Sequence, residues 1–123
     1  MATFTKLALQ PAGTTGDGLG ILVAATATAG TAIHTASSTA TTIDELWLYA
    51  NNTHSSAVTL TIEFGGVATK DLIRTSIAAS PSGLVLICAG LLIQGNATAK
   101  VVRAFAGTAN VIGLFGYVNR ITA

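Results

Sequence analysis

The chain has 123 residues, of which 50% are hydrophobic and only 9% are charged, and its formal net charge is +1. Charged residues make up about 25% of an average globular domain, so this surface must consist largely of Thr, Ser, Ala, Gly and Asn. The six Lys and Arg residues are spread along the chain, which excludes the clustered cations of a typical nucleic-acid-binding protein. The length predicts one domain over residues 1–123. Because a charge-poor surface is weakly protected against association, we expect much of it to be covered in an assembly.

Residues 1–20 are predicted to form an N-terminal arm and a glycine-rich loop. Thr3–Leu9 is a short strand candidate, in which Phe4 and Lys6 share one face and Leu7 lies on the other. Gln10–Gly20 contains four glycines. It has neither the spacing nor the lysine of a phosphate-binding loop, so we interpret it as a surface loop.

The chain is predicted to be organised around Thr41–Gly66. In Val58–Phe64, apolar and polar residues alternate, which is the period of a strand with one buried face. Leu46–Ala50 is apolar on both faces, which predicts a strand covered on both sides. The polar run Asn51–Ser56 lies between them and is expected to join the two strands as a hairpin. Two further strands are predicted upstream, over residues 19–27 and 31–36.

The second half of the chain predicts three more strands and a charged segment. Thr69–Ile77 is the most charged part and favours an extended segment, although a helical turn is an alternative. Leu84–Ile93 is predicted as a strand that is apolar on both faces, with a kink or bulge at Gly90. Strands over 97–106 and 109–121 follow, joined by the hairpin signal Gly107-Thr108.

These elements predict an all-β domain of about eight antiparallel strands, either a β-sandwich or a barrel-like, jelly-roll-like fold. A single sandwich buries one face of each sheet and leaves the other in water. Several of the predicted strands are apolar on both faces. We therefore expect the surplus apolar faces to form subunit contacts in a homo-oligomer, most simply a homotrimer.

Few residues could carry chemistry, and we expect no enzyme, no catalytic residue, no metal and no cofactor. Asp17 has no second acidic residue nearby, and zinc would need several Cys or His ligands at short spacing. His34 is interpreted as a strand residue whose ring is hydrogen-bonded, and Cys88 as an inert core residue. Glu45 and Glu63 could face each other across the predicted hairpin, but an ordinary solvated face explains both.

Three observations bear on location. The N-terminus lacks the charged and apolar regions of a signal peptide. The apolar run Leu84–Ile93 is too short to cross a bilayer as a helix, so no membrane is expected as a partner. The single cysteine cannot form an internal disulfide, which is typical of a protein made in a reducing cytoplasm.

The segments 43–52 (IDELWLYANN) and 58–66 (VTLTIEFGG), together with the glycine-punctuated end 111–121 (VIGLFGYVNRI), resemble small virion proteins of tailed bacteriophages. Within that group the chain is similar to capsid decoration, or cement, proteins, which commonly sit as trimers on the outside of the head. The resemblance implies a structural protein of the capsid surface, made in the host cytoplasm, with itself and the major capsid protein as partners. As argued above from the residues, no nucleic acid and no membrane are expected as partners.

Three alternatives stay open. A cellular scaffold or shell protein would share the charge-poor surface. Small tail, head–tail connector and fibre-knob proteins share the same sequence style. A carbohydrate-binding β-sandwich module would need exposed aromatic residues on one face, and Trp47 and Tyr49 at i, i+2 could form such a platform. We interpret both instead as core or subunit-interface residues. The candidate subunit or capsid interface consists of Phe4, Lys6, Leu7, Trp47, Tyr49, Lys70, Asp71, Arg74, Phe115 and Tyr117.

Overall fold

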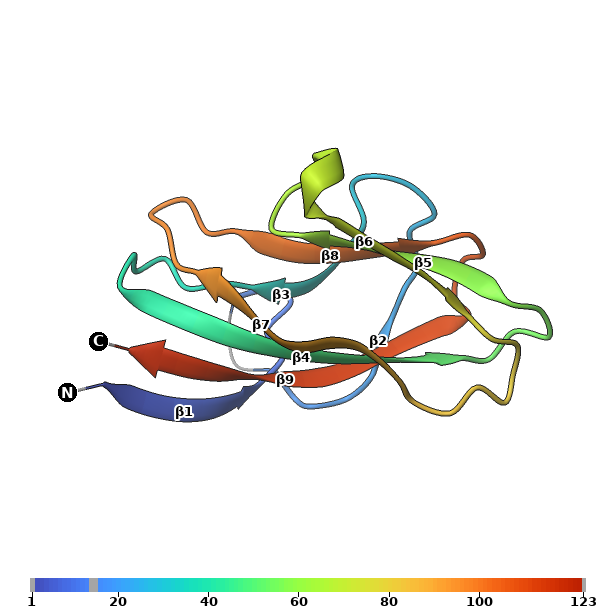
Figure 1. The fold of residues 1–123 in the computed structure, drawn as a ribbon, viewed down its shortest axis with the longest axis horizontal. Coiled ribbons are helices and arrows are strands. Elements are labelled where there is room, and N and C mark those ends of the chain that lie inside the picture. Colours follow the sequence, from blue (N-terminus) through green and yellow to red (C-terminus); the bar gives the residue numbers. More distant parts are fainter. Residues whose placement is uncertain (1, 14–15, 123) are drawn as a thin grey trace.

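The computed structural model describes residues 2–13 and 16–122, which form two antiparallel sheets and one 3₁₀ turn (Figure 1). Thr14 and Thr15 of the predicted glycine-rich loop lie outside the described residues. Sheet A has the strand order β1-β9-β4-β7, with β2 also paired to β9, and sheet B has the order β3-β8-β5-β6. The elements are β1 (Thr3–Ala8), β2 (Ile21–Leu22), β3 (Thr31–Thr35), β4 (Thr42–Asn52), β5 (Val58–Phe64), η1 (Thr69–Asp71), β6 (Leu72–Ile77), β7 (Val85–Gln94), β8 (Val101–Ala106) and β9 (Ile112–Thr122).

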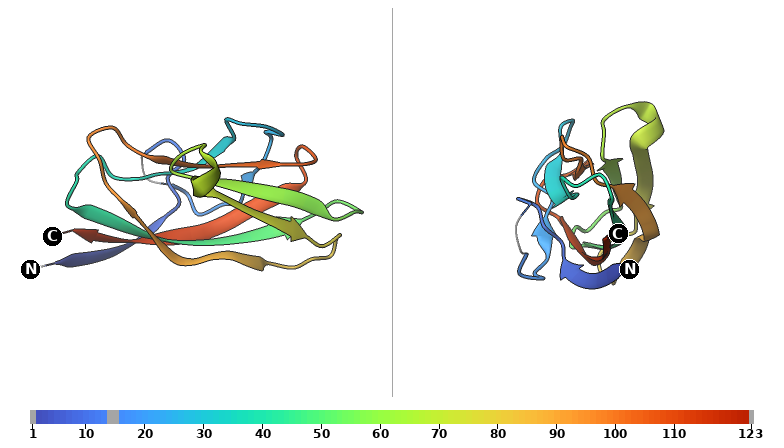
Figure 2. Two further views of the ribbon diagram at one scale, coloured as in Figure 1. Left: turned by 45° about the horizontal axis from the view of Figure 1, so that its top comes forward. Right: turned by 90° about the vertical axis from the view of Figure 1, so that its left-hand side faces the viewer.

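The strand pairs are nested in the way that defines a jelly roll. β5 pairs with β6, β4 with β7, β3 with β8, and β1 with β9, all antiparallel. The chain is therefore a long hairpin rolled into two sheets, which places its two ends side by side (Figures 1 and 2). The predicted all-β sandwich is confirmed, and it is not a closed barrel.

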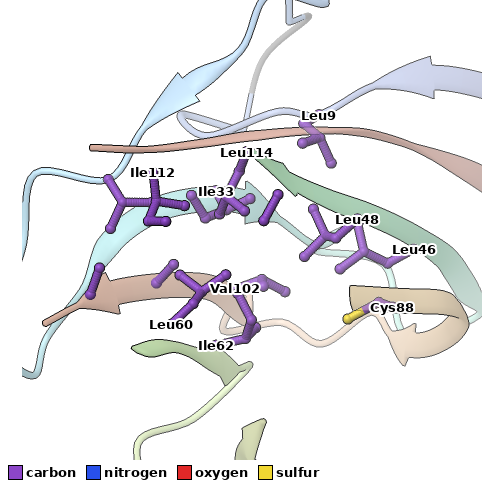
Figure 3. Close-up of a cluster of buried hydrophobic side chains, with 14 of the residues drawn as sticks. Leu9, Ile33, Leu46, Leu48, Leu60, Ile62, Cys88, Val102, Ile112 and Leu114 are labelled. Carbon is purple, nitrogen blue, oxygen red and sulfur yellow. The ribbon is translucent and has the colours of Figure 1, made fainter. Parts of the chain in front are cut away.

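Alternation of side chains separates the inside of the sandwich from the outside. In β4 every second residue is buried over eleven positions, and in β9 the buried residues Ile112, Leu114 and Val118 follow the same period. The inner faces of both sheets meet in one apolar core (Figure 3). Leu46 and Leu48 from sheet A and Leu60 and Ile62 from sheet B are completely buried in it.

Both predicted hairpins are wrong, because each pair of strands lies in two different sheets. β4 belongs to sheet A and β5 to sheet B, so Glu45 and Glu63 do not face each other. Glu63 is also not solvated as expected, because it is buried and accepts hydrogen bonds from Thr28 and from the N–H of Gly30. The side chain of buried Asn52 explains the turn into the other sheet. Its Nδ2 donates to the carbonyl oxygens of Ser56 (3.0 Å), Ile77 (3.3 Å) and Ala78 (3.1 Å). Gly107-Thr108 likewise connects β8 in sheet B to β9 in sheet A.

Other local predictions are confirmed in part. Gly90 is the extra residue of a β-bulge, with φ of 76°, because Leu46 pairs with Leu91 and Trp47 pairs with Ala89. Residues 69–77 combine the two alternatives, since the 3₁₀ turn η1 precedes strand β6. The strand predicted over 19–27 is limited to β2. The N-terminal arm is not free, because β1 pairs with β9 at six positions.

A buried polar network joins the two sheets. His34 on β3 is completely buried, as predicted for a ring with hydrogen-bond partners. Its Nδ1 accepts from the backbone N–H of Gln10 (3.1 Å), which makes Nε2 the protonated nitrogen, and Nε2 donates to Asp44 on β4 (2.7 Å). Arg120 on β9 donates to both oxygens of Asp44. The network thus fixes the segment after β1, one strand of sheet B and two strands of sheet A.

Candidate interaction face

The outer faces of the two sheets differ sharply in composition. Five of the seven aromatic residues of the chain lie on the outer face of sheet A, namely Phe4, Trp47, Tyr49, Phe115 and Tyr117. The outer face of sheet B instead carries Thr59, Arg74, Ser76 and Arg103, with Phe105 as its aromatic residue. Water readily solvates polar and charged side chains of this kind. We therefore take the outer face of sheet A, named here the aromatic face, as the candidate functional surface.

The strand register arranges the aromatic face in rows that run across β1, β9 and β4. Residues directly opposite each other in neighbouring strands share a row, because their side chains point to the same side. The first row is Phe4, Ile121, Ile43; the second is Lys6, Asn119, Glu45; the third is Ala8, Tyr117, Trp47. A polar row thus lies between two apolar ones.

Hydrogen bonds and stacking hold Trp47 in one orientation. Its ring is parallel to that of Tyr117, with 6.1 Å between centroids and 8° between planes. Its Nε1 donates to Oε1 of Glu45 (2.8 Å), and Nδ2 of Asn119 donates to the same oxygen (3.0 Å). Nζ of Lys6 lies 4.9 Å from the centroid of Tyr117, within the range of a cation–π interaction. These contacts preorganise the centre of the face before any partner binds.

Glu45 is the anion of the aromatic face. The hydrogen bond from Trp47 and then that from Asn119 lower the pKa of this carboxyl below 4.5, although desolvation acts in the opposite direction. Both hydrogen bonds go to Oε1. Oε2 accepts none of the hydrogen bonds found among residues 2–13 and 16–122. A charged oxygen is therefore presented to solvent beside an indole ring.

Large apolar side chains around this centre are exposed. Phe4 is 72% exposed, Leu92 on β7 59% and Phe115 37%. Gly20 lies against the ring of Phe115, where a Cβ would be only 2.7 Å from the nearest ring carbons. Leu22 on β2 and Leu86 on β7 are exposed as well. Exposed apolar side chains gathered on one face often mark an interaction site.

Six of the ten predicted interface residues lie together on this face, namely Phe4, Lys6, Trp47, Tyr49, Phe115 and Tyr117. Trp47 and Tyr49 are therefore not core residues. Leu7 points to the inside of the sandwich, since it is paired with buried Val118. The remaining three residues lie elsewhere. Lys70 and Asp71 form an ion pair on η1 (2.9 Å), and Arg74 on β6 donates to Thr61 on sheet B (3.3 Å).

Sequence reasoning missed Glu45, Asn119, Ile43 and Ile121 as parts of the same surface. Their alternation with buried residues in 43–50 and 112–121 carried a signal, since each is two or four residues from an outward aromatic residue. What the sequence did not show was that the first, fourth and last strands are neighbours.

The described residues contain no group of three or more His, Cys, Asp or Glu side chains that could hold a metal ion. A surface hollow of about 260 Å³ beside η1 brings Lys70, Asp71 and Lys100 together, but Asp71 is already paired with Lys70. Cys88 on β7 is buried, and burial raises the pKa of its thiol to about 11. Such a high pKa opposes the use of this thiol as a nucleophile.

Comparison with protein-family models, with curated proteins and with solved structures finds no match to this chain. Within the described residues, no helix has the length and apolar character needed to cross a membrane.

Proposed function

We propose that the protein is a structural protein of a bacteriophage virion, a capsid decoration protein that reinforces the head without doing chemistry. The observation that carries this proposal is the aromatic face, a large, preorganised and partly apolar surface on a rigid sandwich. The resemblance of the segments 43–52, 58–66 and 111–121 to small phage virion proteins supplies the context. A jelly-roll sandwich is a common building unit of viral capsids, which agrees with this role without being specific to it.

Reinforcement follows from mass action. A protein that binds the closed shell more tightly than the opened one stabilises the closed shell by the binding free energy at the prevailing concentration. Self-association of the chain increases this effect. Binding through one subunit raises the effective concentration of the others at their own sites.

Two surfaces have separate roles in this function. The aromatic face serves contact between copies. The charged segment with Lys70, Asp71 and Arg74 is directed to the major capsid protein, because it offers polar groups at the edge of sheet B. A side chain of Lys70 that is 80% exposed can reach a partner without rearrangement of the fold.

Co-sedimentation with undecorated heads tests the proposal. The intact protein is expected to bind heads in a fixed ratio, and the double variant Lys70→Glu/Arg74→Glu is expected to bind at least tenfold more weakly. Ser76→Glu is the matched control, since Ser76 is exposed on β6, the strand that carries Arg74. Failure of the intact protein to bind heads would move the assignment to the tail, connector or fibre.

The part that the N-terminal arm plays in the aromatic face is tested by substitution and not by deletion. Residues 3–8 form a strand of sheet A, and Gln10 takes part in the buried network, so removing 2–9 would damage the fold as well as the surface. Phe4→Ser changes only an exposed side chain. Equal melting temperatures for this variant and the natural chain would show that the fold is intact.

One observation favours carbohydrate binding as a second candidate function. Trp47 and Tyr117 are parallel rings with Glu45 and Asn119 beside them, and aromatic rings next to hydrogen-bonding groups are what a sugar needs. Screening the purified protein against immobilised glycans tests this alternative. Binding that Trp47→Ala abolishes, without loss of stability, would support it over the structural role.

A further inference from the structure

The aromatic face carries one cation and one anion on a single row, with an amide between them. Lys6 on β1, Asn119 on β9 and Glu45 on β4 are directly opposite one another in the register. Lys6 forms no ion pair with a carboxylate among the described residues, and Oε2 of Glu45 is free of hydrogen bonds within that same part of the chain. Each group is therefore available to an opposite charge from outside the molecule.

We infer that the aromatic face binds the same face of a second copy, about a two-fold axis that runs approximately along β9. Such an axis exchanges the two sides of β9, so β1 of one copy lies over β4 of the other. Lys6 of each copy then meets Glu45 of its partner, and two ion pairs form across the contact. This inference concerns the chain alone and does not depend on binding to heads.

The neighbouring rows fit the same axis. In the third row, the small Ala8 lies over the large Trp47 of the partner, which matches a protrusion with a recess. In the first row, Phe4 lies over Ile43 of the partner, which would cover the most exposed aromatic side chain of the chain as described. Two sheets packed face to face prefer strand directions within about 30° of each other. A small tilt of the axis away from β9 meets that preference.

Moving the axis off β9, toward β4, removes the complementarity. An axis midway between β9 and β4 would bring Lys6 over Leu92 and Glu45 over Asn119 of the partner, since Leu92 is opposite Glu45 on β7. A lysine would then lie on an apolar side chain, and the carboxylate would have no cation. Charge complementarity therefore selects β9 as the axis, and leaves Leu86 and Leu92 of β7 at the margin of the contact.

Mixing two charge-reversed variants tests the inference. In Lys6→Glu, both contacts become Glu against Glu; in Glu45→Lys, both become Lys against Lys. Each variant alone is expected to associate at least tenfold more weakly than the natural chain. A mixture of the two restores both opposite-charge contacts, so it is expected to form a mixed pair. Sedimentation and native mass spectrometry of proteins that differ in mass, at micromolar concentration, measure this directly.

Two controls separate pairing from folding. Equal thermal unfolding of the variants shows that the loss of pairing is not a loss of structure. Arg74→Glu, on the outer face of sheet B, should not change self-association. The two-fold contact would be overturned if the natural chain stays monomeric or forms a trimer. It would also be overturned if a mixture of the two variants fails to associate. Head binding is measured separately, so its failure would leave this result intact.

Discussion

Arg120 and Asp44 lie opposite each other on β9 and β4, and the guanidinium donates to both oxygens of the carboxylate, at 2.8 and 2.9 Å. His34 completes the contact from sheet B. A charged cluster thus occupies one end of the core. Its hydrogen bonds satisfy the buried polar groups of three strands. Acid, or the substitution of one of these residues, should therefore change the free energy of unfolding by a measurable amount.

Acid is expected to remove ~2 kcal/mol of unfolding free energy through Asp44. Burial would raise the pKa of this carboxyl, but the hydrogen bonds from Arg120 and His34 outweigh it and lower the pKa from 3.8 to about 2. The stabilisation is therefore complete above the unfolded value of 3.8 and is lost as the pH falls toward about 2. Urea unfolding between pH 6 and pH 2 measures it. Asp44→Asn lacks this titration, so identical pH slopes in the two proteins would contradict the prediction.

Replacing His34 by alanine is expected to destabilise the fold by ~3 kcal/mol. The substitution leaves the N–H of Gln10 without its acceptor and Asp44 without one donor, and it opens a cavity in a completely buried site. His54→Ala is the matched control, because His54 lies in the loop between β4 and β5 and is half-exposed. Chemical denaturation of both variants at pH 7 compares them. A similar loss in each would show that the network adds little.

Gly90→Ala is expected to cost ~1–2 kcal/mol and to change the fluorescence of the single tryptophan. The residue has φ of 76°, and a Cβ would be 3.3 Å from the ring of Trp47. Gly83→Ala separates the two effects, since Gly83 has φ of 66° and nothing within 4 Å of its Cβ position. The variant at position 83 should show the backbone strain without the spectral change. The same emission spectrum in both variants would mean that Trp47 does not depend on the bulge.

Cys88 is expected to be unreactive in the folded protein. Its side chain is 1% exposed, and burial raises the pKa of the thiol to about 11, so almost no thiolate forms at pH 8. A chromogenic disulfide reagent should therefore detect no thiol in buffer and one per chain in 6 M guanidinium chloride. Rapid reaction in buffer, at the rate of a free thiol, would place Cys88 on an accessible surface.

The sequence was sufficient to predict local structure, but it was not sufficient to predict which strands pair with each other. Alternation in Val58–Phe64 and the glycine in Leu84–Ile93 indicated a strand and a bulge correctly, because both depend on residues close in the chain. The two hairpins were wrong because a polar loop permits either a turn within one sheet or a crossing between sheets. The choice depends on Asn52, whose side chain binds carbonyl groups about 25 residues away.

The aromatic face could be predicted only as separate pieces. Phe4, Trp47 and Tyr117 each occur at an outward position of a predicted strand, but three distant segments had to be placed side by side before they formed one surface. Glu45 was read as an ordinary solvated residue for the same reason. Its neighbour Asn119 is 74 positions away in the chain. The alternation of residues within one strand gives no information about contacts at that separation.

The position of β9 has a consequence for how the chain is made. This strand is the last of the fold, yet it lies inside sheet A, where β1, β2 and β4 all pair with it. Until residue 122 has emerged from the ribosome, β1 and β4 have no strand between them. The inner face of sheet A, which covers one side of the core, is then incomplete. The apolar strands of the nascent chain therefore stay exposed until synthesis of β9 is complete. During that time the chain depends on chaperones, or on folding faster than it aggregates.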